Sequence, residues 1–345
     1  MKVAERISKL RGKMMEKGID MYIVPTADFH QSEYVGEHFK EREFITGFTG
    51  SAGTAVITKS EARLWTDGRY FIQAAKELEG TTVELMKMGE PGVPTMDAYL
   101  QDTLQAGEVL GFDGRAVAMG EGLGYEAIAA AKGASIKYEY DLIDEVWEDR
   151  PALSEEPAFA LDIKYTGESV ESKLGRIREV MKANGATTHV LTTLDDICWT
   201  LNIRGNDIEY FPLVLTYAVI TMDKMDLYIN EVKLDDQMKA DLAKDGVVLH
   251  PYNDIYEDIK NVTESETLLI DPANLNYALY NNIPEGVKKV EKANPEIIFK
   301  AMKNPVEIDN IRVAELKDSV AHVRFMKWLK ENVGKMKITE MSASD

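Results

Sequence analysis

The hydrophobic and polar positions of this chain follow a pattern that occurs twice. Apolar residues recur every three or four positions over 4–17, which predicts a helix, and a glycine and the apolar strand 21–24 follow. The same order returns later as a predicted helix over 171–184, a glycine, and a strand over 188–191. The pattern therefore predicts two similar units of helix and strand.

The two units also share residues at steady offsets. Ala-Val-Ile-Thr at 55–58 recurs at 218–221, and the apolar position Leu64 recurs as Leu227. Nearer the start of each unit, three identities lie 167 positions apart: Gly18 and Gly185, Thr26 and Thr193, and Asp28 and Asp195. We interpret these matches as a tandem duplication of one α/β unit.

Domain boundaries are expected where the composition changes. The polar, proline-bearing stretch 147–157 is typical of a linker. It divides a first domain, residues 1–157, from a second, residues 158–303. Residues 304–345 form a third segment, which opens with a capping asparagine, a proline at the first helical position and a glutamate two residues on.

A long helix is predicted from this third segment. Its apolar residues recur at roughly helical spacing at Ile308, Ile311, Leu316, Val320, Val323 and Leu329. We expect the apolar face to fold back on the second domain or to pair with another chain, because large exposed apolar patches find partners. A second helix-start signal at 338–345 stands at the chain end, which we interpret as truncation.

The stretch 44–73 carries the strongest candidate for a binding site. Two short apolar runs form a predicted hairpin after three closely spaced glycines, and Asp67-Gly68 then makes a turn. Arg69 follows this turn at the start of a helix, where its guanidinium could bind a carboxylate or a peptide carbonyl. The alternative is a structural salt bridge from Arg69 to Asp67 or Glu77.

Composition narrows the classes of partner. The 345 residues carry 59 acidic and 40 basic side chains, a net charge of −19 that repels nucleic acid phosphates. The single cysteine, Cys198, excludes an intrachain disulfide and fits a reducing compartment. We see no secretory leader and no apolar stretch near the roughly 20 residues that cross a bilayer, which indicates a cytoplasmic protein without membrane partners.

Other chemical candidates are weaker. Ser51 lacks the first glycine of a nucleophile elbow, and Cys198 stands in an apolar context typical of an inert thiol. His30 and His38 flank a loop with two glutamates, but no histidine stands at zinc-ligand spacing.

The neighbouring carboxylates Asp195 and Asp196 invite a metal or acid–base interpretation. Because adjacent side chains point in different directions, we expect them to cap a helix instead of sharing one ligand. The residues by themselves thus indicate two α/β units and one candidate anion-binding arginine, without catalytic machinery.

Several motifs nevertheless resemble those of a known family. Residues 48–55 and 65–71 resemble the first domain of the three-domain, cytosolic-type Xaa-Pro aminopeptidases, the aminopeptidase P family. Residues 202–209 resemble the signature of the second domain of that family. Arg312, Ala321-His322, Phe325, Trp328-Leu329 and Thr339-Glu340 resemble the opening of its catalytic domain.

The resemblance implies a fold and a reaction. The implied fold is α/β: two tandem creatinase/prolidase N-terminal-like domains, each a mixed sheet flanked by helices, then the first helix of a truncated pita-bread domain. The implied enzyme is a metallo-aminopeptidase that removes the N-terminal residue from peptides with proline in second position. Two divalent ions, typically manganese, activate the attacking water there.

The resemblance also limits what this chain can do. The family's metal ligands and catalytic histidines belong beyond the first helix of the catalytic domain, so we assign no catalytic or metal residue here and expect the chain alone to be inactive. Arg69 matches a family arginine that binds the peptide, which in related homodimers comes from the neighbouring subunit. The chain would then contribute substrate access and oligomerisation.

A second hypothesis belongs to a different class. The chain could act as a stand-alone, non-catalytic module that binds peptides or has a regulatory role. A reading frame that stops after Asp345 would favour this alternative.

Overall fold

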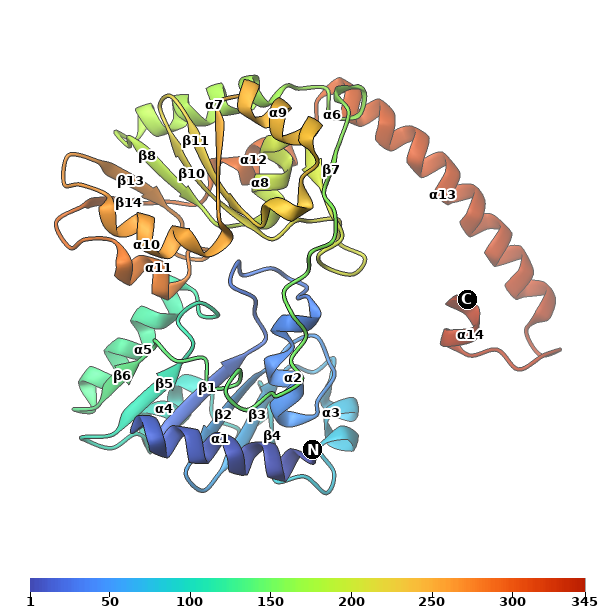
Figure 1. The fold of residues 1–345 in the computed structure, drawn as a ribbon. Helices are drawn as coiled ribbons and strands as arrows, with labels where there is room; N and C mark the ends of the chain where they lie inside the picture. The colour runs from blue at the N-terminus through green and yellow to red at the C-terminus, as the bar shows by residue number, and fades with distance from the viewer. Residues whose placement is uncertain (345) are drawn as a thin grey trace.

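The computed structural model describes residues 1–344 and contains two α/β domains stacked end to end, with a long helix beside them (Figure 1). We call domain I the unit with strands β1 to β6 and domain II the unit with β8 and β10 to β14. They are joined by a segment without helix or strand between β6 and β7, which includes residues 147–157. Within the described residues, no helix is both long and apolar enough to cross a bilayer.

Domain I is a six-stranded mixed sheet in the order β4-β3-β2-β1-β5-β6. Its strands are β1 (Met21–Pro25), β2 (Thr54–Thr58), β3 (Ala62–Thr66), β4 (Glu84–Lys87), β5 (Val109–Phe112) and β6 (Ser135–Lys137). Its helices are α1 (Val3–Lys17), η1 (Glu37–Phe39), α2 (Glu41–Thr46), α3 (Phe71–Glu77), α4 (Met96–Thr103) and α5 (Met119–Ala131).

Domain II has a sheet of the same design, in the order β12-β11-β10-β8-β13-β14. Its strands are β8 (Thr188–Leu191), β10 (Thr216–Thr221), β11 (Met225–Ile229), β12 (Val247–His250), β13 (Thr267–Ile270) and β14 (Lys288–Glu291). A small second sheet pairs β7 (Phe159–Ala160) with β9 (Ile203–Arg204). The helices are α6 (Ile163–Thr166), α7 (Val170–Ala183), α8 (Leu194–Leu201), η2 (Glu231–Lys233), α9 (Asp236–Lys244), η3 (Tyr252–Asp254), α10 (Ile255–Asp258), η4 (Ile259–Asn261), α11 (Tyr277–Asn282) and α12 (Pro295–Ala301).

The strand register confirms the tandem duplication. In domain I the antiparallel strands β1 and β2 pair Met21 with Thr58, and in domain II β8 and β10 pair Thr188 with Thr221. Met21 and Thr188 lie 167 positions apart, and Thr58 and Thr221 lie 163 apart, which are the two offsets found between the units in the sequence. The remaining strand pairs also match in direction, so the two sheets have the same topology.

The first helix of domain I and the glycine that precedes the first strand of each domain form as the apolar spacing and the glycine positions predict. Helix α1 buries its apolar stripe, Ile7, Leu10 and Met14, against the sheet. Gly18 and Gly185 then adopt φ values of 63° and 68°, a left-handed conformation that costs glycine little, and turn the chain into β1 and β8.

The two domains share an extensive interface, which the duplication itself did not predict. Residues 114–120 of domain I and 272–278 of domain II exchange backbone hydrogen bonds, among them one of 2.7 Å from the Met119 amide to the Leu275 carbonyl. Tyr277 of domain II belongs to the apolar core of domain I, where its ring lies in edge contact with Phe112.

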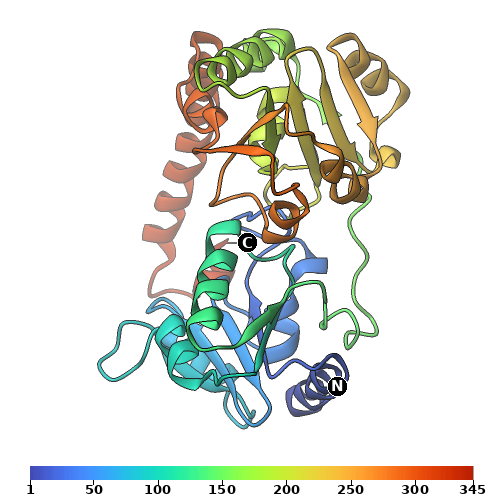
Figure 2. The ribbon, with the colours of Figure 1, turned by 90° about the vertical axis from the view of Figure 1, so that its left-hand side faces the viewer.

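Beyond the two domains, the prediction of a long helix is confirmed as α13 (Pro305–Asn332), with the expected capping box at Asn304 and Glu307. Of the two outcomes expected for its apolar face, folding back on domain II is wrong, whereas pairing with another chain stays a prediction. No residue of α13 is buried; the helix contacts α6 of domain II and extends from there away from the two domains (Figure 1), and Figure 2 shows it from the side.

The reason lies in how its apolar residues are distributed. At about 100° per residue, Ile308 and Val313 lie roughly 140° apart around the helix, so the apolar surface is not confined to one face. A single surface of domain II could not cover it. The chain end, expected to carry only a helix-start signal, forms a short helix, α14 (Glu340–Ser344).

Candidate functional site

The turn that carries Arg69 is fixed by the strands around it. Strand β3 ends at Thr66, whose buried hydroxyl donates to the Ala52 carbonyl at 2.7 Å. The glycine stretch runs close against this strand, since a Cβ on Gly53 would lie 2.8 Å from the Trp65 carbonyl oxygen. Only glycine permits that approach, so these residues anchor the turn to the sheet edge.

Arg69 is paired in the structure. Its Nε and Nη2 each donate to the Asp67 carboxylate at 2.9 Å, while its side chain remains 68% exposed. The hydrogen bonds from the Arg69 side chain and backbone lower the pKa of Asp67 to about 2, and the carboxylate raises the pKa of Arg69. The salt bridge to Asp67 that we weighed as the alternative therefore exists. The one considered to Glu77 does not form.

Polar side chains surround this turn. The hydroxyls of Ser51 and Tyr70 lie 2.6 Å apart, and the Arg69 Cζ lies 5.2 Å from the centre of the Tyr70 ring. Glu77 instead accepts from the amide and hydroxyl of Thr49, at 2.9 and 2.7 Å. The guanidinium is thus presented on a surface rich in hydroxyl groups.

A cleft of about 720 Å³ opens next to this surface, between the two domains. Residues 49–51 line it from domain I and residues 206–210 from domain II. Its carboxylates outnumber its two cations, Lys40 and Arg42. The acidic side chains are Glu33, Glu37, Glu43, Glu156, Asp207 and Glu209.

Arg42 is a structural residue that the sequence did not reveal. It is buried beneath the glycine stretch, where Nε donates to the Thr26 hydroxyl at 2.9 Å and the two Nη atoms donate to the Phe48 and Gly50 carbonyls. Burial lowers its pKa to about 10. Two of its three partners are backbone carbonyls, which carry no sequence motif, so only the tertiary structure reveals these contacts.

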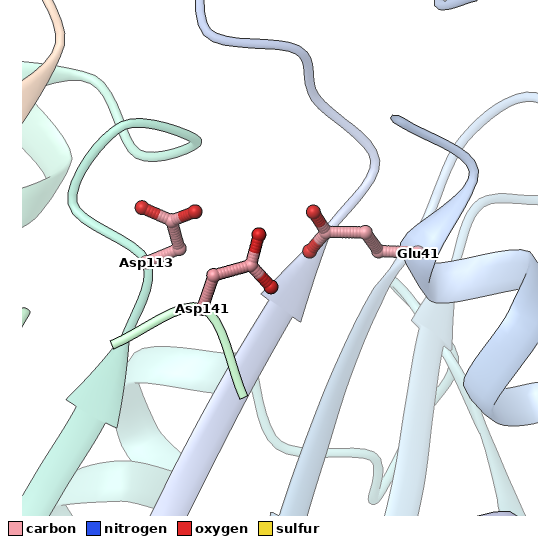
Figure 3. A group of neighbouring side chains, drawn as sticks. All are labelled: Glu41, Asp113 and Asp141. Atoms are coloured by element: carbon pink, nitrogen blue, oxygen red, sulfur yellow. The ribbon is translucent and has the colours of Figure 1, made fainter. Parts of the chain in front are cut away.

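Three carboxylates converge elsewhere in domain I. Glu41, Asp113 and Asp141 point toward one another, each with an oxygen within 4.8 Å of the others (Figure 3). Arg150 binds Glu41 at 2.5 Å and Asp141 at 2.8 Å, and Arg115 binds Asp113 at 2.7 Å. Two guanidinium groups therefore already neutralise these oxygens. The cluster does not fit a dinuclear metal centre, and it ties the start of the linker to domain I.

The two loop histidines are not joined in one site. His30 is buried between the domains: Nδ1 lies 2.9 Å from the Thr192 carbonyl and Nε2 2.6 Å from the Tyr252 hydroxyl. Burial lowers the pKa of His30, so Nδ1 carries the proton and Nε2 accepts from the tyrosine. His38 instead lies 2.7 Å from the Pro151 carbonyl of the linker.

Two further sequence interpretations are resolved. Cys198 is buried, and burial raises its thiol pKa to about 12, which agrees with an inert residue.

The expectation that Asp195 and Asp196 cap a helix is wrong. Thr193 is the N-cap of α8 and neither aspartate caps it, whereas Lys300 of α12 binds both carboxylates, reaching Asp196 at 2.8 Å. A lysine from a distant helix can reach two diverging side chains at once.

Comparison with known proteins agrees with this architecture. The creatinase/prolidase N-terminal domain family matches residues 6–145 and, as a second variant, residues 149–307. The fold and these matches define a protein built from two such domains.

Similarity to whole proteins is more specific. The chain is 38% identical over 96% of its length to Xaa-Pro aminopeptidase 1 of Dictyostelium discoideum and 35% identical over 99% to aminopeptidase P2 of Arabidopsis thaliana. It superimposes with a TM-score of 0.94 and 34% identity on the X-prolyl aminopeptidase of Caenorhabditis elegans, described as a cytosolic enzyme with a di-nuclear active site. The chain belongs to the Xaa-Pro aminopeptidase, or aminopeptidase P, family.

The match covers only part of these relatives. The chain spans 54% and 53% of the two curated proteins and 58% of the C. elegans chain. The matches confirm the family resemblance and the two α/β domains that it implied. The role of Arg69, and the identity of residues 304–345 as the opening of a catalytic domain, remain predictions.

Proposed function

We propose that this chain is the N-terminal region of an Xaa-Pro aminopeptidase, which removes the N-terminal residue from peptides with proline in second position. The observation that carries the proposal is the match across both domains and α13 to proteins of that name, of which the chain spans about half. The C. elegans relative is described as cytosolic, which supports our proposal of a cytoplasmic protein.

In this proposal the catalytic metal ions, two divalent ions and by family manganese, are held outside residues 1–345. The carboxylate cluster of Glu41, Asp113 and Asp141 supports this placement, because Arg115 and Arg150 already occupy its oxygens. The chain alone is then inactive as a peptidase. Its own residues serve substrate access and the assembly of subunits.

Helix α13 supports a further domain beyond domain II. A helix with apolar side chains on several sides is typical of the interior of a domain. Ile308, Val313 and Leu316 are 37%, 56% and 68% exposed in the structure, although all are large and apolar. We therefore propose that residues 304–345 open a pita-bread metallopeptidase domain, with domain I as residues 1–157 and domain II as residues 158–303.

Arg69 is the proposed substrate-binding residue of this region. Its guanidinium lies at the sheet edge, exposed beside the cleft between the domains, which suits recognition of an anionic or carbonyl group on a peptide. We propose that the protein acts as a homodimer in which Arg69 of one subunit serves the peptide site of the other.

The experiment begins with the genome downstream of codon 345. We expect the frame to continue, and the complete product, purified with Mn²⁺, to hydrolyse peptides with proline in second position. Residues 1–345 purified alone should bind neither metal ion and release no product. Hydrolysis by residues 1–345, or an inactive complete product, would contradict the proposal. A stop codon after 345 would favour the non-catalytic peptide-binding module instead.

A further inference from the structure

The Arg69–Asp67 pair uses only one edge of the guanidinium. An arginine has five N–H donors, and Asp67 accepts two of them, from Nε to Oδ1 and from Nη2 to Oδ2, each at 2.9 Å. The edge formed by Nη1 and the second hydrogen of Nη2 remains. Within residues 1–344, Nη1 makes no hydrogen bond.

The backbone holds this pair in one orientation. The Arg69 amide donates to Oδ1 of Asp67 at 3.0 Å, and the Tyr70 amide donates to the Asp67 carbonyl at 3.0 Å. The Tyr70 ring lies beneath the guanidinium, and its hydroxyl is hydrogen-bonded to Ser51. Side chain, turn and ring therefore restrict rotation of the guanidinium, although it stands on the surface.

The remaining edge has a specific chemical preference. Its two N–H groups are parallel and about as far apart as the two oxygens of a carboxylate, so a terminal carboxylate accepts both. An internal peptide carbonyl offers one oxygen and gains less from the same edge. A fixed guanidinium therefore favours peptides short enough to place their C-terminus at Arg69.

We infer that Asp67 is a positioning residue, which holds Arg69 by its Nε/Nη2 edge so that its Nη1/Nη2 edge receives the C-terminal carboxylate of a short peptide substrate. The inference rests on the proposed function, since it deepens the role proposed there for Arg69. It names the substrate class, short peptides with a free C-terminus, and the residue that sets the preference.

The positioning can be tested on residues 1–345 without any activity. In nuclear magnetic resonance spectra of the guanidinium groups at low temperature, Arg69 should show slowed rotation about its Nε–Cζ bond. Asp67→Ala should remove this slowing. The matched reference is Arg312, an exposed arginine that reaches Asp309 through Nη1 alone at 3.1 Å. Rotation of Arg69 as fast as that of Arg312 would overturn the inference.

The substrate preference is tested in the complete gene product with two tripeptides, Ala-Pro-Ala as the free acid and as the C-terminal amide. Arg69→Ala should raise KM for the acid by about 10-fold and leave KM for the amide little changed. Asp67→Ala should raise KM for the acid several-fold without lowering kcat. Asp67→Asn, which keeps one acceptor, should fall between Asp67→Ala and the unaltered protein.

The possible results distinguish the proposed substrate-binding role of Arg69 from the positioning role of Asp67. If Arg69→Ala changes neither KM, the proposed role of Arg69 fails. If Arg69→Ala is selective for the acid but Asp67→Ala is without effect, only the positioning inference fails. An equal rise in KM for acid and amide in Asp67→Ala would indicate a merely structural role for this carboxylate and would also overturn the inference.

Discussion

The ring of Tyr277, from domain II, packs directly against the backbone of Gly122 in helix α5 of domain I. A Cβ on Gly122 would lie 2.1 Å from the ring, closer than any real contact. Tyr277 is 1% exposed, and its hydroxyl donates to Glu126 of the same helix at 3.1 Å. One domain thus supplies a core residue to the other, and the missing side chain of Gly122 makes room for it.

Removing this residue should destabilise both domains together. Tyr277→Ala deletes a buried aromatic ring, and we expect the free energy of unfolding to fall by about 3–5 kcal/mol. Urea denaturation followed by tryptophan fluorescence measures it. Separate transitions for the two domains in the unaltered protein would contradict the shared core.

Two glycines of α5 form a matched test of the contact. Gly122→Ala forces Tyr277 out of its place, and overpacking of this kind costs about 1–3 kcal/mol. Gly124→Ala, on the same helix, meets no atom within 4 Å and should stabilise the protein by about 0.4–1 kcal/mol, because it restricts the unfolded chain. Equal effects of the two substitutions on the urea midpoint would argue against the packing described.

Arg150 should be the most sensitive residue of the linker. Its side chain is 4% exposed and neutralises the buried carboxylate of Glu41. Arg150→Ala leaves the carboxyl groups of Glu41 and Asp141 without this partner, and breaking a buried pair costs about 3–5 kcal/mol. Thermal and urea unfolding should both register it. The control is Arg312→Ala, whose exposed ion pair with Asp309 contributes about 1 kcal/mol at most.

The buried pair of His189 and Glu296 should make stability depend on pH. Both histidine nitrogens face acceptors: Nδ1 lies 3.0 Å from the Leu269 carbonyl and Nε2 3.4 Å from the Glu296 carboxylate. Burial opposes protonation of His189, but the Glu296 carboxylate and the hydrogen bonds outweigh it, and the pKa of His189 is raised.

The sign of the pH effect follows from that raised pKa. The pair contributes fully below the pKa of an unfolded histidine, about 6.5, and its contribution is lost as pH rises through the higher folded pKa. The stability advantage of the unaltered protein over Glu296→Gln should therefore shrink as pH increases across this window. Urea unfolding at several pH values measures it. An advantage that grows with pH would contradict the assignment.

Cys198 should report unfolding without disturbing the native state. Burial raises its thiol pKa to about 12, so almost no thiolate forms near neutral pH. We expect iodoacetamide to leave the native protein unmodified at pH 8 and to label it in denaturant, as mass spectrometry will show. Rapid labelling of the native protein would indicate that the thiol is accessible.

Only some features of the candidate site could be predicted from neighbouring residues in the sequence. The sequence placed Arg69 in a tight turn at a sheet edge, because the hairpin runs and Asp67-Gly68 are signals within a few residues of one another. It could also name Asp67 as a partner, two positions away. It could not reveal Arg42 beneath the glycine stretch or the cleft beside it, which depend on contacts with backbone carbonyls and on the approach of domain II.

The sequence by itself determined the elements and their duplication, since apolar periodicity, glycine stops and caps act over one or two turns of chain. Only the tertiary structure decided how the two units meet. Tyr277 with Gly122, and His30 with Tyr252, lie 155 and 222 positions apart, and their contacts arise from packing at the interface. Tertiary packing likewise decided that Lys300 reaches both Asp195 and Asp196, and that α13 contacts α6 of domain II but buries none of its residues there, because such contacts depend on shape in three dimensions.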